Sequence, residues 1–275
     1  MTARPIAAVE FTAWRAGQRS AIAGLALLSV VCLLAVFGPA MAPGPWVISG
    51  DVLVPPSAAH PLGTDDLGRD VRTGILLGAR VSLLIGVIAA SLASTVGLAI
   101  GGIAGMRGGV VDEVLMRIAE VFQAMPRLFL ILVVVTVYGS GLWLVAILVG
   151  ATYWPSSARL VRSQVMMVRT ADFVTAARAL GCGSARVLLR HVLPSAVGPL
   201  AVHAAFQAGG AILVEAGRSF LGVGDSSMVS WGGMLSEAHH FMRDAWWIGV
   251  FPGLAITLTV LAWSLLADGL TPRRS

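Results

Sequence analysis

Few side chains in this 275-residue sequence have a type and spacing that could support chemistry. Glu215 and Arg218 lie three residues apart, which favours an ion pair on one helical face over a gate or a substrate contact. His239 and His240 are adjacent, and imidazole binds nickel readily. Neighbouring side chains on a helix point about 100° apart, so this pair alone makes a poor chelate. We therefore expect no metal site in the chain.

Other polar side chains lie within or beside long apolar stretches. His203 is the only well-embedded histidine, and no Gly-x-Ser-x-Gly run accompanies it, which disfavours an intramembrane protease. Few carboxylates interrupt the apolar stretches, so an ion-coupled secondary transporter is a less favoured alternative. Glu120 and Arg127 lie two turns apart, and a functional role and a role as boundary charges stay equally open for them.

All 19 basic residues are arginines, because the sequence contains no lysine. A P-loop requires a lysine that reaches the β- and γ-phosphates of a nucleotide. The chain therefore cannot be a Walker-type ATPase. We expect no enzyme activity and no cofactor in this chain, and any ATP that drives its work must be bound by another protein.

The composition indicates an integral membrane protein. Hydrophobic residues make up 57% of the chain and charged residues 12%, with a mean hydropathy of +0.85, whereas soluble domains carry about 25% charged residues. The arginines form no continuous basic face, so the net charge of +5 does not indicate nucleic acid binding. Cys32 and Cys182 are too few for a disulfide framework or a four-ligand zinc site.

The apolar runs predict an all-α fold with six membrane-spanning helices. A hydrocarbon core of about 30 Å needs roughly 20 apolar residues per helix. The first run lacks a convincing small-residue cleavage site after it, so it is interpreted as a retained anchor. The charge-free stretch 128–158 is too long for one helix and is broken at 139–141, so the helix before the break must begin near Val114. The expected helices are 21–42, 81–106, 114–138, 142–160, 195–215 and 246–267.

The distribution of arginine predicts the orientation of these helices. Thirteen arginines fall in the two termini, the 107–117 loop and the 159–193 segment, whereas five fall in the opposite segments, 43–80 and 215–245. Positive residues stay in the cytoplasm. We therefore expect residues 1–20 and the tail 269–275 to be cytoplasmic, and 43–80 to form an outer loop.

The 159–193 segment is longer than a connector between two helices needs. Four of its apolar residues recur at i, i+3, i+4 and i+7, which predicts one face of a short helix. They are Phe173, Ala176, Ala177 and Leu180. Gly181 and Gly183 should stop this helix, and Pro194 should bar a second short helix from continuing into the membrane. The small, alanine-rich face favours docking against protein, with contact to lipid headgroups as the alternative.

The same segment contains an ordered series of residues. It reads Asp172-Phe173-Val174-Thr175-Ala176-Ala177-Arg178-Ala179-Leu180-Gly181, followed by Arg190-His191-Val192-Leu193-Pro194. This series resembles the EAA loop of bacterial ABC importer permeases, which has Glu-Ala-Ala, three residues, Gly, and Leu-Pro about a dozen residues on. Thr175 stands where Glu is usual, so the resemblance does not carry over any ion pair of that Glu.

A second series lies before the helix expected at 81–106. It reads His60-Pro61-Leu62-Gly63-Thr64-Asp65-Asp66-Leu67-Gly68-Arg69-Asp70. It resembles the outer segment of the shorter, C-type permease subunit in the dipeptide, oligopeptide and nickel branch of these importers. His60, Gly63, Thr64, Asp65, Gly68, Arg69 and Asp70 carry this match, and His60 is interpreted as structural. Further matches, such as Ser230-Trp231-Gly232, extend the resemblance over about residues 60 to 270.

The resemblance implies a type I ABC importer permease fold, with a permease domain over 81–268 and a cytoplasmic coupling helix. The implied partners are a second, related permease that forms the pathway, two cytoplasmic ATPases that bind ATP and Mg, and an extracytoplasmic binding protein. The expected location is the bacterial inner membrane. Di- or oligopeptides are the expected solutes, with nickel or a chelated metal as the alternative.

Overall fold

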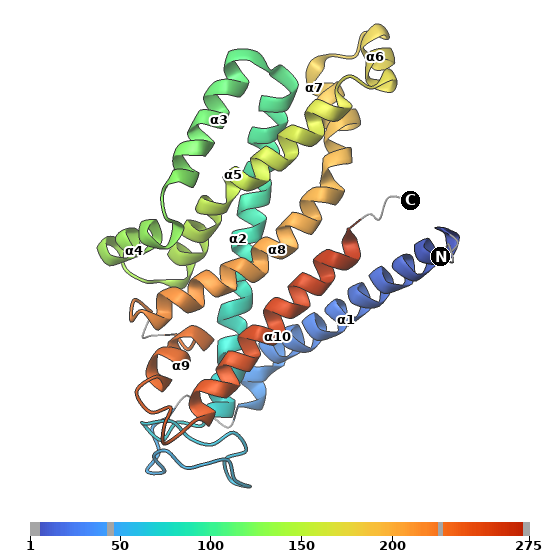
Figure 1. The fold of residues 1–275 in the computed structure, drawn as a ribbon. Coiled ribbons are helices and arrows are strands. Elements are labelled where there is room, and N and C mark those ends of the chain that lie inside the picture. Colours follow the sequence, from blue (N-terminus) through green and yellow to red (C-terminus); the bar gives the residue numbers. More distant parts are fainter. Residues whose placement is uncertain (1–5, 43–46, 225–227, 272–275) are drawn as a thin grey trace, which may run out of the picture.

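The computed structural model describes residues 6–42, 47–224 and 228–271, and within them the chain is helical without a β-strand (Figure 1). Parts of the expected termini and outer loop, namely 1–5, 43–46 and 272–275, lie outside these residues. The helices are α1 (Ile6–Met41), α2 (Val71–Arg107), α3 (Gly109–Ala124), α4 (Arg127–Tyr138), α5 (Leu142–Val168), α6 (Asp172–Ala179), α7 (Ser184–Val187), the π-helix η1 (Leu188–Val192), α8 (Leu193–Phe220), α9 (Trp231–Ala238) and α10 (Trp247–Leu270).

Five stretches in the described residues are long and apolar enough to cross a membrane. They are Gly17–Met41, Val71–Arg107, Leu142–Val168, Ser184–Phe220 and Trp247–Leu270. The pair α3 and α4 supplies a sixth span if the two helices are counted together. The expectation of an all-α, multi-span membrane protein is therefore confirmed.

The single helix expected at 114–138 is instead two helices, α3 and α4, which meet at an angle of 79°. Pro126 separates them, and Met125 before it is extended, with φ −81° and ψ 134°. A proline lacks the N–H that a helix needs and disfavours helical geometry in the residue before it. The bend places Arg127 at the first position of α4.

Helices α2 and α5 pack with their backbones in close approach along a stripe of small residues. A Cβ atom on Gly97 would lie 2.3 Å from the Ser157 Cβ, and one on Gly101 would lie 2.3 Å from the Ala158 carbonyl oxygen. Small residues at four-residue spacing let membrane helices approach closely and gain van der Waals contact. The stripe thus joins α5, which leads into the 159–193 segment, rigidly to α2.

The sequence predicts that the helical path stops before Pro194. In the structure the path continues through it. Helix α7 passes through η1 into α8, and the Leu193 N–H bonds to the Leu188 carbonyl five residues back. Pro194 lies in the first turn of α8, directly after the π turn, and it supplies no N–H to the helical hydrogen bonds. The wide π turn before it therefore lets α7 and α8 form one continuous, bent rod.

The bundle presents two distinct ends (Figure 1). Helices α6 and α7 lie at one end, and the segment that precedes α2 lies with α9 at the other. The start of α1 and the end of α10 both point toward the α6 end, and these two helices lie side by side. Functional side chains predicted from sequence thus fall at opposite ends of one helical framework.

Candidate functional site

Helix α6 is held on the protein by two of its own side chains. Val174 is fully buried and Ala177 is 8% exposed, and both belong to an apolar cluster that includes Val161 and Val165 of α5. Val187 of α7 joins the same cluster. Because these residues come from α5, α6 and α7, the short helix is fixed to the end of α5 by side-chain packing.

The opposite face of α6 is apolar and exposed. Phe173 is 53% exposed, Leu180 is 86% exposed, and Ala176 between them is also exposed. The sequence had grouped Ala177 with this face, but the structure turns Ala177 toward the protein, at the edge of the helix. The face that α6 presents is therefore Phe173, Ala176 and Leu180, and we call it the α6 face.

Gly181 ends α6 through a backbone conformation rather than through a lack of space. Its φ is +81°, and a Cβ atom there would meet nothing within 4 Å. The Gly181 N–H bonds to the Arg178 carbonyl and the Cys182 N–H bonds to the Ala177 carbonyl. These two bonds form a Schellman motif, whose left-handed position favours glycine. The motif fixes Leu180 as the last side chain of the α6 face.

The remaining predicted residues of this segment are also exposed. Asp172 and Thr175 are exposed on the first turns of α6, and the Thr175 hydroxyl bonds weakly to the Ala171 carbonyl at 3.4 Å. Arg190 and Pro194 are also exposed, but on η1 and α8. Arg178 and Arg186 add two more exposed guanidinium groups. The exposed charges of this segment are thus predominantly positive.

One link at this end was not predicted from sequence. Arg162 of α5 donates two hydrogen bonds to the Asp112 carboxylate of α3, at 2.5 and 2.6 Å. Arg169, just after α5, donates to the Gly105 carbonyl of α2 at 2.9 Å. The two partners are 50 residues apart in the chain, a separation that no local pattern reveals. These bonds join the end of α5, which precedes α6, to α2 and α3.

At the other end, the His60–Asp70 series folds into a compact unit around Asp65. The Asp65 Oδ1 accepts hydrogen bonds from the N–H groups of Leu67 and Arg69, at 2.9 and 2.8 Å. The Arg69 Nε lies 2.6 Å from the Asp65 Oδ2, and the Arg69 Nη2 also pairs with Glu237 of α9. Burial raises the pKa of the Glu237 carboxyl, and Arg69 offsets only part of that rise. The unit is thereby tied to α9.

The rest of the series fixes the start of α2. Asp70 caps the helix, with its Oδ1 accepting from the Thr73 N–H at 2.9 Å and its Oδ2 lying 3.1 Å from His60 Nδ1. Thr64 is fully buried, and its carbonyl accepts a bond from the Trp247 indole at 3.0 Å. Gly63 and Gly68 are also buried, and both take a positive φ in the turns of this series. The cap explains why α2 begins at Val71, ten residues before the predicted position.

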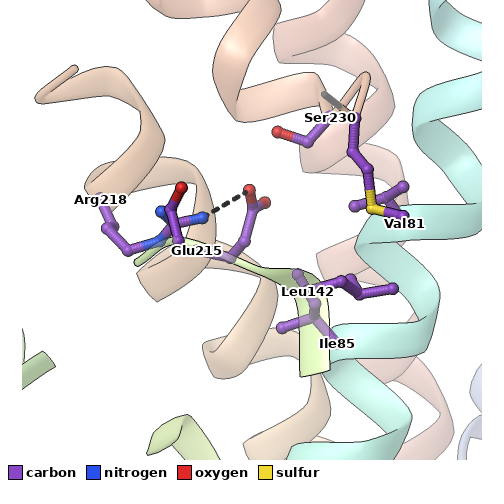
Figure 2. Close-up of a pocket in the computed structure, with 8 residues that line it drawn as sticks. Val81, Ile85, Leu142, Glu215, Arg218 and Ser230 are labelled. Atoms are coloured by element: carbon purple, nitrogen blue, oxygen red, sulfur yellow. Dashed lines mark ion pairs between the residues drawn. The ribbon is translucent and has the colours of Figure 1, made fainter. Parts of the chain in front are cut away.

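Glu215 and Arg218 form the ion pair that their spacing predicted, at the end of α8 nearest α9 (Figure 2). They are 1% and 3% exposed, and the Arg218 Nη2 lies 3.8 Å from the Glu215 Oε1. The Ser219 hydroxyl donates to the same oxygen at 2.8 Å. The pair borders a small pocket, together with side chains from α2 and α5 and with Ser230. It is a buried junction of several helices.

The groups that could attract a metal ion have other roles in the described residues. Asp65, Asp66 and Glu237 gather their oxygens within 4.8 Å, but Arg69 already supplies a positive charge to Asp65 and Glu237. His239 and His240 are exposed, with ring centroids 3.6 Å apart, and His239 Nδ1 bonds to the Ser236 carbonyl. Arg69 thus compensates the charges of Asp65 and Glu237, and the two imidazoles are open to solvent.

Comparisons with known proteins agree with this architecture. Residues 97–274 match the family described as "Binding-protein-dependent transport system inner membrane component". The dipeptide transport system permease protein DppC of Bacillus subtilis (strain 168) is 36% identical over 97% of this chain and 85% of the relative. The oligopeptide transport system permease protein OppC of the same organism is 35% identical over 92% of this chain and 84% of the relative. A chain of the MetNI methionine ABC transporter, solved in inward-facing conformations, has a similar fold, with a TM-score of 0.57, 16% identity, and coverage of 72% of this chain and 97% of that chain.

Proposed function

Because this chain belongs to the family of binding-protein-dependent transport system inner membrane components, we propose that it is the membrane-spanning subunit of an ATP-driven peptide importer. The solute assignment rests on the relatives, whose names specify dipeptide and oligopeptide transport. Those relatives match over more than 90% of this chain. The chain binds no ATP of its own, and it forms the pathway together with a second, related permease.

The coupling of ATP hydrolysis to transport is assigned to the α6 face. The eight-residue helix α6 exposes Phe173 to water, and Leu180 directly after it is also exposed. Exposed apolar side chains of this kind indicate a surface that a partner covers. A cytoplasmic ATPase with an apolar groove is that partner. The exposed arginines of the same segment predict acidic side chains on the ATPase near the groove.

The path of the motion follows from the contacts at the base of α6. Val174 and Ala177 fix α6 to α5 and α7, so a displaced α6 moves the ends of α5 and of the α7–α8 rod. The Arg162–Asp112 bonds extend the displacement to α3. Closure of the ATPase pair on ATP would thereby be converted into movement of membrane helices.

This function sets the orientation. The α6 end lies in the cytoplasm with the ATPases, and the His60–Asp70 unit faces outward, where a binding protein delivers the peptide. The arginine distribution supports this direction, because the exposed arginines gather at the α6 end. Both termini are then cytoplasmic, since the start of α1 and the end of α10 point the same way.

The proposal is tested by uptake into proteoliposomes. The chain is reconstituted with its partner permease and ATPases, with the binding protein outside and ATP inside. We expect a radiolabelled dipeptide or oligopeptide to accumulate only when ATP and the binding protein are both present. Accumulation of nickel but not of peptide would assign the alternative solute, and accumulation by the permeases alone on an ion gradient would refute an ATP-driven mechanism.

A further inference from the structure

A group of polar side chains meets between α5 and α8, away from both ends of the bundle. Gln207 is 4% exposed, and its Nε2 donates to the Tyr153 carbonyl and to the Ser156 hydroxyl, each at 3.1 Å. Its Oε1 accepts from the Ser157 hydroxyl at 3.2 Å. His203 Nε2 lies 3.3 Å from the same Ser156 hydroxyl. Two membrane-spanning helices are thus joined by amide, hydroxyl and imidazole groups.

Arg127 adds a positive charge to this group. Its Cζ lies 3.9 Å from the centre of the Tyr153 ring, which is the geometry of a cation–π contact. Glu120, which lies two turns before it in the sequence, pairs with Arg117 at 3.2 Å. Among the residues that the structure describes, no carboxylate forms an ion pair with Arg127.

The group lies near the middle of both long helices. At a rise of about 1.5 Å per residue, Tyr153 and Ser156 are roughly 17 to 21 Å from the first residue of α5. His203 and Gln207 are roughly 15 to 21 Å from the first residue of α8. A hydrocarbon core is about 30 Å thick, and Ser156 lies less than one turn before Arg159, so the group lies inside the span toward its cytoplasmic end.

A guanidinium at this depth is costly if it faces lipid, and such charges mark pathways for solutes or ions. Arg127, Ser156 and His203 are all partly exposed rather than sealed in the core. The surface that they share must therefore border water or a polar partner when the transporter is assembled. The Ser156 hydroxyl and the Gln207 amide already donate within the group, so the guanidinium of Arg127 is the donor that faces outward from it. A guanidinium favours an anion, and carboxylate is the anion that matches its planar fork.

We propose that Arg127, stacked on Tyr153 beside Ser156, His203 and Gln207, forms an anion-binding site on the translocation pathway that takes the terminal carboxylate of a peptide in transit. This inference rests on the proposed function for the identity of the solute. Every peptide with a free C-terminus carries this carboxylate, whatever its side chains. A contact to it would guide peptides without selecting among sequences.

The test measures the charge preference of a thiol placed beside Arg127. Cys32 and Cys182 are replaced by serine, Ser156→Cys supplies the only thiol of this chain, and the whole transporter is reconstituted. An anionic sulfonatoethyl and a cationic trimethylammonioethyl methanethiosulfonate are compared during ATP turnover, relative to their rates with a free thiol. We expect the anionic reagent to be favoured roughly tenfold, and Arg127→Gln to abolish this preference. Saturating dipeptide, delivered by the binding protein, should slow the reaction.

Val133→Cys serves as the matched control, because Val133 lies on α4 with 48% of its surface exposed but has only apolar neighbours in sequence. We expect it to react with neither reagent. Failure of the Ser156→Cys variant to react, or a rate ratio unchanged by Arg127→Gln, would overturn the anion site, and a lack of protection by dipeptide would overturn its peptide ligand. Peptide uptake is measured in the same vesicles. The unsubstituted transporter is assayed in parallel vesicles. If it takes up no peptide while the Ser156→Cys variant keeps its charge preference, the proposed function is refuted and the anion site stands.

Discussion

Arg162 and Asp112, 50 residues apart in the chain, form a two-point ion pair that joins α5 to the first turn of α3. The Asp112 side chain is 13% exposed and that of Arg162 is 33% exposed, so the pair is only partly screened by water. Arg162 lies on α5, the helix that directly precedes α6. We interpret it as the connection through which movement of α6 reaches the bent pair α3 and α4.

The first prediction concerns this connection. Asp112→Asn should weaken it by about 1 to 3 kcal/mol, because a hydrogen-bonded charge is lost, and should lower peptide uptake per ATP hydrolysed. Combining it with Arg162→Gln should add little, since both changes break the same bond. Glu120→Gln, which breaks an exposed pair on the same helix, is the control and should change nothing. Additive losses in the double variant would contradict this role.

The second prediction concerns the end of α6. Gly181→Ala should destabilise the Schellman turn by about 1 kcal/mol, because alanine disfavours a φ of +81°, although space is available. Gly183→Ala is the matched control, since its φ is −65° and its surroundings are equally open. Stimulation of the ATPase by the loaded binding protein measures the effect. We expect a decrease for Gly181→Ala alone, so equal responses of the two variants would contradict the argument.

The third prediction concerns the contact between α2 and α5. Gly101→Ala would place a Cβ atom 2.3 Å from the Ala158 carbonyl oxygen, so the helices must separate. We expect a Tm several degrees lower in detergent, in line with the roughly 1 to 3 kcal/mol cost of overpacking. Gly198→Ala in α8 meets nothing within 4 Å and should leave the Tm unchanged or slightly raised. A normal Tm for Gly101→Ala would refute backbone-close packing at this stripe.

The fourth prediction is a pH dependence. Because burial raises the pKa of Glu237, its ionised form is disfavoured in the folded state, despite Arg69. The neutral carboxyl is the form that the fold tolerates, so its contribution to stability is full below the ordinary pKa of Glu. That contribution is lost as the pH rises through the raised pKa of Glu237. The difference in Tm, that of Glu237→Gln minus that of the unsubstituted protein, should therefore be more positive at pH 8 than at pH 4.5. The reverse trend would show that the pairing with Arg69 outweighs burial.

Run lengths and periodicity predicted much of the fold. The six apolar runs correspond to the five long helices and the bent pair, and the spacing of Phe173, Ala176 and Leu180 indicated a face that the structure leaves exposed. These features are local, so a single sequence contains them.

The features that escaped prediction depend on tertiary contacts or on backbone chemistry. Counting charge-free residues ignored Pro126, so the bend between α3 and α4 was missed. The sequence predicted an outer loop up to residue 80, but the Asp70 cap, not hydropathy, decides where α2 begins. The partner of Asp112 and the seating of Ala177 require the packed structure, because residues distant in the chain supply both.

The central claim, that the α6 face docks an ATPase, is tested most directly by photo-crosslinking. Benzoyl-phenylalanine replaces Leu180, which is 86% exposed, and in a separate variant replaces Val133 on α4, in membranes that contain the whole transporter. We predict a crosslinked product with the ATPase from position 180 and none from position 133. Absence of an ATPase product at 180, or equal yields at both positions, would contradict the claim.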